Sequence, residues 1–309
     1  MMKPEDNDNF ASAFAVEALR EQRIARRWNN FFKAVFLLYL LGFALVSIPS
    51  FSLGSLISDK KITALIDIQG VISSTTDASS DMIVTGLRAA FEEENTAGVI
   101  VRINSPGGSP VQSSYINDEI YRLKRENPDI PVYAVIQDVG ASGGYYVAVA
   151  ADEIYANKSS IIGSIGVRID GFGFVESLGK LGIERRLLTA GANKGFLDPF
   201  SPLKQEDVQH IKGMLKEIHE QFISRVRKGR GNRLVDSPEL FSGYVWSGER
   251  CLELGLIDGL GSASFVAREI VGAEKIVDFT PRQNVLDQFA RRVGATITET
   301  FLYGSLGLH

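Results

Sequence analysis

PVYAVIQDVGASGGYYVAVA, residues 131–150, is the stretch that decides the fold. Its apolar run breaks at Gly140, a serine follows at position 142, and the apolar pattern resumes after two more glycines. This pattern predicts a strand, a sharp turn and a helix start with Ser142 at the corner, because glycine allows backbone angles closed to other residues. A helix N-terminus also leaves N–H groups unpaired beside the serine. Ser142 is therefore either a presented nucleophile or a serine that caps a helix.

Strands and helices alternate on both sides of this turn. The predicted strands are 62–72, 98–103 and 132–137, and the predicted helices are 82–94, 110–125, a long one at 204–228, and 263–271. Near-continuous apolar strands between helices predict an α/β fold with a parallel sheet covered on both faces. The loops at Gly107–Gly108 and around Ser142 leave strands at the same end of this sheet, where ligands of such folds collect. The two loops therefore form one candidate site.

Composition excludes several classes of protein. The chain has 309 residues, 45% of them hydrophobic, and a net charge of −4, which argues against nucleic-acid binding. The single cysteine, Cys251, rules out an intramolecular disulfide framework and a zinc site built from several cysteines. We expect Cys251 to be a small residue of the hydrophobic core that lies on a helix. Nothing in the sequence suggests a metal or an organic cofactor.

The N-terminal part carries the signal for cellular location. Residues 34–58 contain no charged side chain, and about 20 apolar residues suffice to cross a bilayer. We expect a single transmembrane anchor at 34–56, because the polar lead is too long for a typical signal peptide and the run is apolar on every face. The arginine-rich flank predicts that residues 1–33 stay in the cytoplasm. The bulk of the chain would then lie on the periplasmic side of the inner membrane.

A nucleophilic Ser142 requires a group that accepts its proton. Histidine is the usual partner, and the chain offers His210, His219 and His309. His210 and His219 are nine residues apart on the long predicted helix, which places them on roughly opposite sides. One of the two could still lie near Ser142. A hydrolase of the nucleophile-elbow type, with Ser, Asp and His in chain order, therefore remains an open alternative.

A lysine is the other possible base, provided that it loses its charge. Burial lowers the pKa of a lysine by up to roughly 3–5 units from about 10.4. Lys194 is the best candidate by context, since it lies among small residues in a segment that returns toward the sheet and then turns at two prolines. A solvated loop lysine is the competing interpretation.

Four motifs occur in order and with compatible spacing. They are RINSPGG at 102–108, GASGGYY at 140–146, GSIGV at 163–167, and the lysine at 194 before FLDPFSP at 196–202. Together they resemble the signal peptide peptidase A family, the membrane-anchored S49 serine peptidases, over about residues 62–271. On this resemblance the chain divides into a cytoplasmic segment (1–33), an anchor (34–56), an S49 peptidase domain (60–276) and a C-terminal tail (277–309).

The resemblance implies a fold and a set of site residues. The fold would be the β-α superhelix of the Clp protease and crotonase group. The family implies a serine–lysine dyad, with Ser142 as nucleophile, Lys194 as general base and Ser164 supporting the lysine amine. Gly107 or Gly108, together with Gly143, would supply the N–H groups that hold the oxyanion, and we expect the peptide to lie along residues 105–109.

The chain has one catalytic repeat and so resembles the short form of the family. Several protomers of such a form assemble into a homo-oligomer, and the lysine can reach a serine on a neighbouring subunit. The expected substrates are unfolded apolar peptides, such as cleaved signal peptides or damaged segments of membrane proteins, and the expected membrane contact is through the anchor. A crotonase-type acyl-CoA enzyme and a non-catalytic oligomeric membrane scaffold are the remaining alternatives, and neither needs Ser142 or Lys194.

Overall fold

The computed structural model describes residues 26–41 and 60–282, in a chain that divides into two units, Met1–Asp59 and Lys60–His309. Residues 26–41 are helical and exposed. Among the described residues, no helix combines the length and the apolar character that a membrane crossing requires. Residues 42–56 of the expected anchor lie outside the described ranges, as do residues 1–25 and the tail from 283 onward.

The second unit is built on one mixed sheet of eight strands. The path through the sheet is β6-β5-β3-β2-β1-β8, and β4 pairs with β3 and with β7. The pairs among β1, β2, β3, β4, β5, β7 and β8 are parallel, whereas β6 joins β5 in the antiparallel sense. The strands are β1 (Ile62–Gln69), β2 (Thr96–Ser105), β3 (Val132–Ala141), β4 (Glu153–Ala156), β5 (Ile161–Gly163), β6 (Val245–Ser247), β7 (Gly259–Leu260) and β8 (Ile276–Asp278). The predicted α/β alternation is confirmed.

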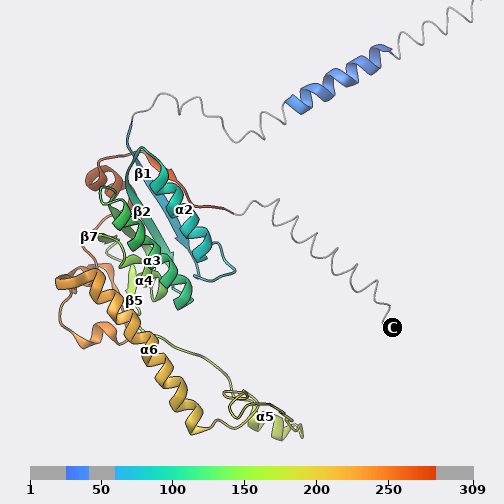
Figure 1. Ribbon diagram of the computed structural model, residues 1–309, viewed down its shortest axis with the longest axis vertical. Coiled ribbons are helices and arrows are strands. Elements are labelled where there is room, and N and C mark those ends of the chain that lie inside the picture. Colours follow the sequence, from blue (N-terminus) through green and yellow to red (C-terminus); the bar gives the residue numbers. More distant parts are fainter. Residues whose placement is uncertain (1–25, 42–59, 283–309) are drawn as a thin grey trace, which may run out of the picture. The chain divides into compact units, whose positions relative to one another are not determined.

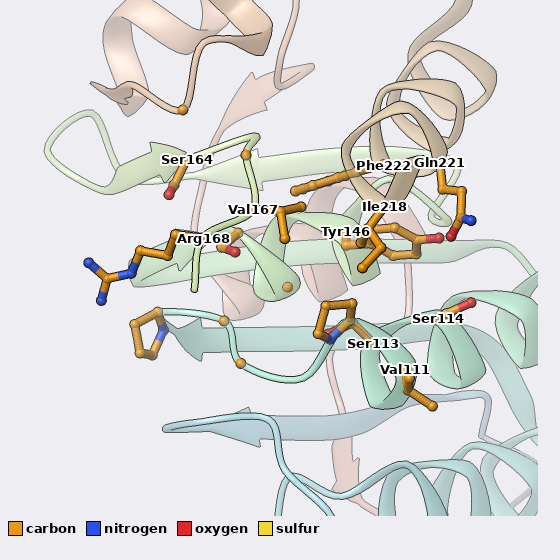
Figure 2. A pocket seen from close by; sticks show the side chains of 18 of the residues that line it. Val111, Ser113, Ser114, Tyr146, Ser164, Val167, Arg168, Ile218, Gln221 and Phe222 are labelled. Atoms are coloured by element: carbon orange, nitrogen blue, oxygen red, sulfur yellow. The ribbon is translucent and has the colours of Figure 1, made fainter. Parts of the chain in front are cut away.

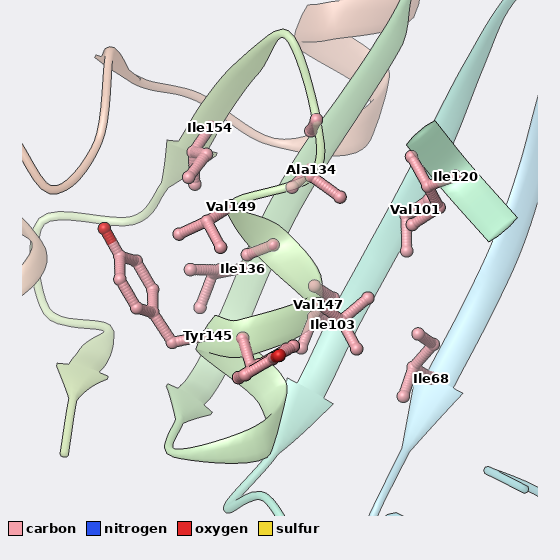
Figure 3. Close-up of a cluster of buried hydrophobic side chains, with 14 of the residues drawn as sticks. Ile68, Val101, Ile103, Ile120, Ala134, Ile136, Tyr145, Val147, Val149 and Ile154 are labelled. Carbon is pink, nitrogen blue, oxygen red and sulfur yellow. The ribbon is translucent and has the colours of Figure 1, made fainter. Parts of the chain in front are cut away.

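Three helices and the larger hydrophobic core lie against one face of this sheet (Figure 1). They are α2 (Ser80–Glu92), α3 (Pro110–Glu126) and α4 (Gly143–Ala148). Alternate strand residues such as Ile68, Val101 and Ile136 meet Ile120 of α3 and Val147 of α4 in this core, all of them almost fully buried (Figure 3). Each such side chain contributes roughly 1.5–3 kcal/mol through its burial. The core thereby fixes the ends of β2 and β3, from which both glycine loops leave.

The other face of the sheet is covered only in part, which differs from the prediction of a sheet covered on both faces. A smaller cluster packs Leu65, Ile100 and Val135 against Val266. Val266 belongs to the predicted helix 263–271, which is a short α8 (Ala263–Phe265) followed by a π-helical turn, Val266–Val271. Nearer the carboxyl ends of the strands this face is polar, and Arg102 of β2 pairs with Asp67 of β1 at 2.9 Å. Charged strand residues on that part of the face explain why none of the described helices covers it.

The longest helix, α6 (Gln205–Arg230), contacts the sheet layer only through its second half. Phe222 packs on Tyr146 of α4 with ring centroids 5.0 Å apart. Arg230, with 1% of its side chain exposed, pairs with Asp258 at 2.6 Å and donates to the carbonyl of Gly255. The first half extends away from the sheet and carries the segment with α5 (Val175–Lys180) beside it (Figure 1). The remaining elements are the 3-10 turns Gly231–Arg233 and Pro238–Phe241 and the helix α7 (Gly248–Glu253).

Candidate active site

Ser142 lies at the predicted corner, between the end of β3 and the first turn of α4. Its backbone angles are φ 51 and ψ −120, a conformation that a side chain rarely adopts. Two hydrogen bonds hold it there: its N–H donates to the carbonyl of Gly163 at 2.8 Å, and its carbonyl accepts from Tyr146 at 2.9 Å. Its side chain caps no helix N–H, so the capping interpretation of this serine is not supported. Ser142 is instead one of the residues that line a pocket.

The loop after β2 passes close against this corner. Gly107 has φ 98, and a Cβ on it would lie 2.6 Å from the nitrogen of Gly143 and 2.8 Å from Cβ of Ser142. A Cβ on Gly143 would lie 3.2 Å from the nitrogen of Gly108. Only glycine permits these approaches. The two glycine loops therefore meet, as the sequence predicted.

The hydrogen bonds distinguish between the two candidate oxyanion glycines. The N–H of Gly107 donates to Oγ of Ser105 at 3.1 Å and is therefore engaged. Within the described part of the chain, the N–H groups of Gly108 and Gly143 have no acceptor. Two unengaged N–H groups beside a serine hydroxyl are the arrangement that stabilises a developing oxyanion. The geometry therefore favours Gly108 over Gly107 as the partner of Gly143.

Ser164 follows the glycine whose carbonyl binds the Ser142 N–H. It too has φ 51, and its own N–H donates to the carbonyl of Tyr244 at 2.7 Å. Gly163 before it has φ 110 and faces the ring of Trp246. Ser142 and Ser164 are thus linked through one residue, and both line the same pocket.

This pocket has a volume of about 1000 Å³, and Ser142 is among its lining residues. Figure 2 shows Ser164, Tyr146 and Phe222 around it. Its walls come from the two glycine loops, the start of α3, and one face of α6. Ile218, Phe222 and Tyr146 supply apolar surface, and Gln221 and Ser114 supply polar groups. The charged residues of its lining, Arg168 and Asp170, are exposed and form an ion pair of 3.4 Å. The lining thus suits an extended chain with apolar side chains.

Ser113 was missed by the sequence reasoning. It is fully buried at the start of α3, and its hydroxyl is the buried side-chain polar atom without a hydrogen-bond partner among the described residues. A Cβ on Gly143 would lie 2.5 Å from this hydroxyl. The available signal was position, because Ser113 shares the buried stripe of α3 with Ile116, Ile120 and Leu123. A serine in an apolar stripe marks a place where a large side chain does not fit.

Lys194 is not brought to Ser142 within one chain. It is exposed, and it lies in a turn in which its N–H donates to the carbonyl of Gly191 at 3.1 Å. Nearby Phe196 packs on His210 of α6, with ring centroids 6.2 Å apart. His210 and Phe222 are twelve residues apart, about 18 Å along a helix, and Phe222 is the residue that packs beside the pocket. The described residues of the pocket lining include no lysine and no histidine.

The two histidines of α6 have different surroundings. His210 is exposed beside Phe196, and a ring nitrogen of His219 lies 3.1 Å from the carbonyl oxygen of Ile165. Neither arrangement presents an imidazole to the hydroxyl of Ser142. The structure therefore gives no support to a Ser–Asp–His constellation built from these residues.

Two buried groups near the pocket are structural. Burial raises the pKa of the Cys251 thiol to about 12, and the residue lies in helix α7, as predicted. Burial likewise raises the pKa of Tyr145, whose hydroxyl donates to the carbonyl of Leu256 at 2.7 Å. Neither group is available as a nucleophile at neutral pH.

Comparisons with known proteins agree with these observations. The model of peptidase family S49 matches residues 124–276. The chain is 34% identical over 206 residues to the "Putative protease slr0021" of Synechocystis sp., a match that covers 66% of this chain and 72% of that protein. It is 45% identical over 209 residues to the Na(+)/H(+) antiporter NhaA of Brucella melitensis, with 67% of this chain covered but only 28% of that protein. The chain thus spans little more than a quarter of that relative.

A solved structure was also found. It is a variant of the membrane-bound stomatin-specific protease 1510-N, 16% identical, with a TM-score of 0.45 and coverage of 73% of this chain and 100% of that one.

Proposed function

The chain belongs to peptidase family S49, and on that premise we propose that it is a serine peptidase with Ser142 as nucleophile and Lys194 as general base. The observation that carries the proposal is the corner at Ser142. A strained serine lies there beside two N–H groups that have no acceptor among the described residues, in the lining of a pocket with apolar walls. This set of features is what acyl transfer to a serine requires.

The proposed reaction has two stages. Oγ of Ser142 attacks the peptide carbonyl carbon while its proton passes to the amine of Lys194, and the carbonyl oxygen becomes an oxyanion held by the N–H groups of Gly108 and Gly143. The carbon–nitrogen bond then breaks, and the leaving amine takes the proton from Lys194. Water hydrolyses the acyl-enzyme by the same route. Each N–H donor is worth on the order of 2.7–4 kcal/mol in the transition state.

We propose that the dyad forms between protomers of a homo-oligomer. Lys194 is exposed and is not among the described residues of the pocket lining, which supports an amine supplied by a neighbouring copy. Around Lys194, the segment 166–204 exposes large apolar side chains such as Leu188, at 96%, and Phe172, at 81%, and contact with a neighbour would cover them. Ser164, next to the Ser142 turn, would then orient the incoming amine.

The proposed substrates are unfolded, apolar peptides, such as cleaved signal peptides or damaged membrane-protein segments. Support comes from the apolar walls formed by Tyr146, Ile218 and Phe222 and from the absence of a charge deep in the described lining. We further propose the Clp protease and crotonase type of superhelix for 60–276, a tail at 277–309, and the anchor at 34–56. The charge-free run at 34–58 and the arginine-rich flank support an inner-membrane location, with the peptidase domain on the periplasmic side.

The test compares turnover of an unfolded, apolar-rich peptide by the unaltered chain and by single variants. Ser142→Ala and Lys194→Ala should each lose at least about 1,000-fold in kcat. Lys180→Ala, in the same exposed segment, and His210→Ala should retain activity. Activity that survives Ser142→Ala would favour an acyl-CoA enzyme of similar fold, and loss in His210→Ala with an active Lys194→Ala would favour the histidine-dependent hydrolase.

A mixing experiment tests the subunit arrangement. Each of the variants Ser142→Ala and Lys194→Ala is inactive alone under the proposal. When the two are unfolded together and refolded, mixed oligomers should regain part of the turnover, because an intact serine meets an intact lysine across an interface. No recovery, from oligomers shown to be mixed, would contradict a dyad formed between protomers. If the unaltered chain cleaves none of the peptides tested, the result would favour the alternative of a non-catalytic oligomeric membrane scaffold.

A further inference from the structure

The loop after β1 forms a bridge to the loop that carries Gly108. Ile72 pairs with Gly108 in an isolated parallel bridge, outside the strands. The N–H of Ile72 donates to the carbonyl of Gly107 at 2.9 Å, and the carbonyl of Ile72 accepts from the N–H of Ser109 at 2.8 Å. Both bonds go to residues on either side of Gly108, so the N–H of Gly108 itself faces away from Ile72. The bridge therefore orients the N–H that the site leaves without an acceptor.

The bridging residue is itself firmly held. The side chain of Ile72 is fully buried in the main core. Before it, the N–H of Gly70 donates to the carbonyl of Asn104 at 2.9 Å and continues the β1–β2 pairing. After it, the hydroxyl of Thr76 donates to the carbonyl of Val71 at 2.8 Å. The main chain of Ile72 is thus fixed relative to the sheet and cannot readily follow a shift of the glycine loop.

The same contact explains the glycine at position 108. A Cβ there would lie 2.1 Å from the carbonyl oxygen of Ile72, far inside van der Waals contact. The loop is therefore pressed against Ile72 on the side opposite to the pocket. A bulky residue at position 108 would displace the loop from Ile72, and loss of activity in such a variant would not show that the peptide lies along 105–109.

We propose that Ile72 is a positioning residue for the oxyanion site. Its main chain holds the loop of Gly107, Gly108 and Ser109 so that the N–H of Gly108 and that of Gly143 converge on one point. This inference rests on the proposed peptidase function. Because an oxyanion exists only in the transition state and the tetrahedral intermediate, the bridge acts on kcat and leaves the binding of the ground-state peptide largely unchanged.

Ser109 offers a matched pair of variants. Its φ is −64, the value that a proline ring imposes, but the ring would take the place of the N–H that donates to the carbonyl of Ile72 at 2.8 Å, so Ser109→Pro removes this bond and pushes the loop away from Ile72. Ser109→Ala keeps this N–H and removes only the hydroxyl, which accepts from the N–H of Gln112 at 3.4 Å. The difference between the two variants reports on the bridge, because both lose the same helix cap.

The experiment measures kcat and KM of the full chain on an apolar peptide, together with the affinity for a peptide aldehyde, whose adduct with Ser142 mimics the tetrahedral intermediate. Relative to Ser109→Ala, we expect kcat of Ser109→Pro to fall about 100-fold, the aldehyde affinity to fall in parallel, and KM to change less than about threefold. Equal kcat in the two variants, or a loss confined to KM, would overturn the proposal.

Amide hydrogen exchange separates this proposal from the proposed function. In the unaltered chain we expect the N–H groups of Ile72 and Ser109 to be protected and that of Gly108 to exchange faster. Ser109→Pro should also speed exchange at Ile72, whereas Ser109→Ala should not. A chain that shows this protection but cleaves no peptide would contradict the peptidase, whereas an active chain with an unprotected Ile72 N–H would contradict the bridge.

Discussion

The two halves of the proposed dyad lie in regions of opposite character. Around Ser142, both glycine loops are packed against a buried sheet and tied by hydrogen bonds to Gly163 and Ile72. Around Lys194, the segment 166–204 has its own short helix, α5, without one buried residue. Its exposed large apolar side chains are Ile169, Phe172, Phe174, Val175, Leu181, Ile183, Leu187, Leu188, Phe196, Phe200 and Leu203. A single chain thus preorganises the proposed nucleophile and oxyanion site but leaves the proposed base, Lys194, on a surface.

The comparison shows which region of one chain contributes most of its stability. The sheet region is stabilised by the burial of apolar side chains from both its strands and its helices. The exposed segment is stabilised by little beyond local contacts, such as the Phe174–Phe200 ring pair with centroids 5.4 Å apart. The helix α6 belongs to both regions, since its second half packs on α4 and its first half on the exposed segment. Substitutions in the two regions should therefore differ sharply in cost.

The largest difference is expected between two arginines. Arg230→Ala removes the buried partner of Asp258, which keeps only its partly exposed pair with Arg233, and should lower the free energy of unfolding by about 3 kcal/mol. Arg185→Ala removes an exposed pair with Asp198, at 3.4 Å, and should cost at most about 1 kcal/mol. Urea unfolding of both variants is the measurement. Equal losses would show that the exposed segment is as firmly folded as the sheet.

A pair of leucines tests the same contrast in apolar packing. Leu87→Ala, in the core face of α2, should cost about 2–5 kcal/mol, because it leaves a cavity. Leu188→Ala, at a side chain that is 96% exposed, should change stability by less than about 0.5 kcal/mol in a dilute chain. Thermal unfolding at several concentrations provides the check. A large loss at Leu188 that grows with protein concentration would place this side chain in an interface.

The backbone at Ser142 should store strain that glycine relieves. Since φ there is 51, Ser142→Gly should be more stable than Ser142→Ala by about 1 kcal/mol. Thr85, on the exposed side of α2, provides the control. There the opposite order is expected: Thr85→Ala should be more stable than Thr85→Gly by about 1 kcal/mol, because glycine is the poorer helix former. The same order at both positions would argue against strain at the nucleophile. The measurement is the denaturant concentration at the midpoint of unfolding for each of the four variants.

The smallest effect concerns pH and the sheet region alone. Hydrogen bonds from Arg122 and Arg88 lower the pKa of Glu119 to about 2 from its usual 4.5. A lowered pKa in the folded state adds stability above the unfolded value, and this stability is lost as the pH falls from about 4.5 toward 2. Both arginines are partly exposed, so the loss should be about 1 kcal/mol. Glu119→Gln should flatten this part of the pH profile of unfolding.

Much of the sheet region could be predicted because its signals are local. Apolar runs and glycines placed β2, β3 and the Ser142 corner, and the predicted helix 110–125 differs from α3 by one residue at its end. The short strands β6, β7 and β8 were missed. They have only two or three residues each, and their pairing depends on partners far away in the sequence.

The position of Lys194 could not be predicted from periodicity. The segment around it has no repeating apolar face, because its apolar residues are not covered by the chain itself. Its placement was expected from a return toward the sheet, whereas it lies along the first half of α6. The choice of Gly108 over Gly107 was likewise beyond the sequence, since it depends on the hydroxyl of Ser105 and the main chain of Ile72.

The distance between Ser142 and Lys194 along α6 has a consequence for biosynthesis. Under the proposed mechanism, a newly made chain is inactive, because its nucleophile has no base until a second copy arrives. Specific activity would then fall on dilution, because a separate chain could not cleave its neighbours. Proteolysis would be switched on by mass action, once protomers associate.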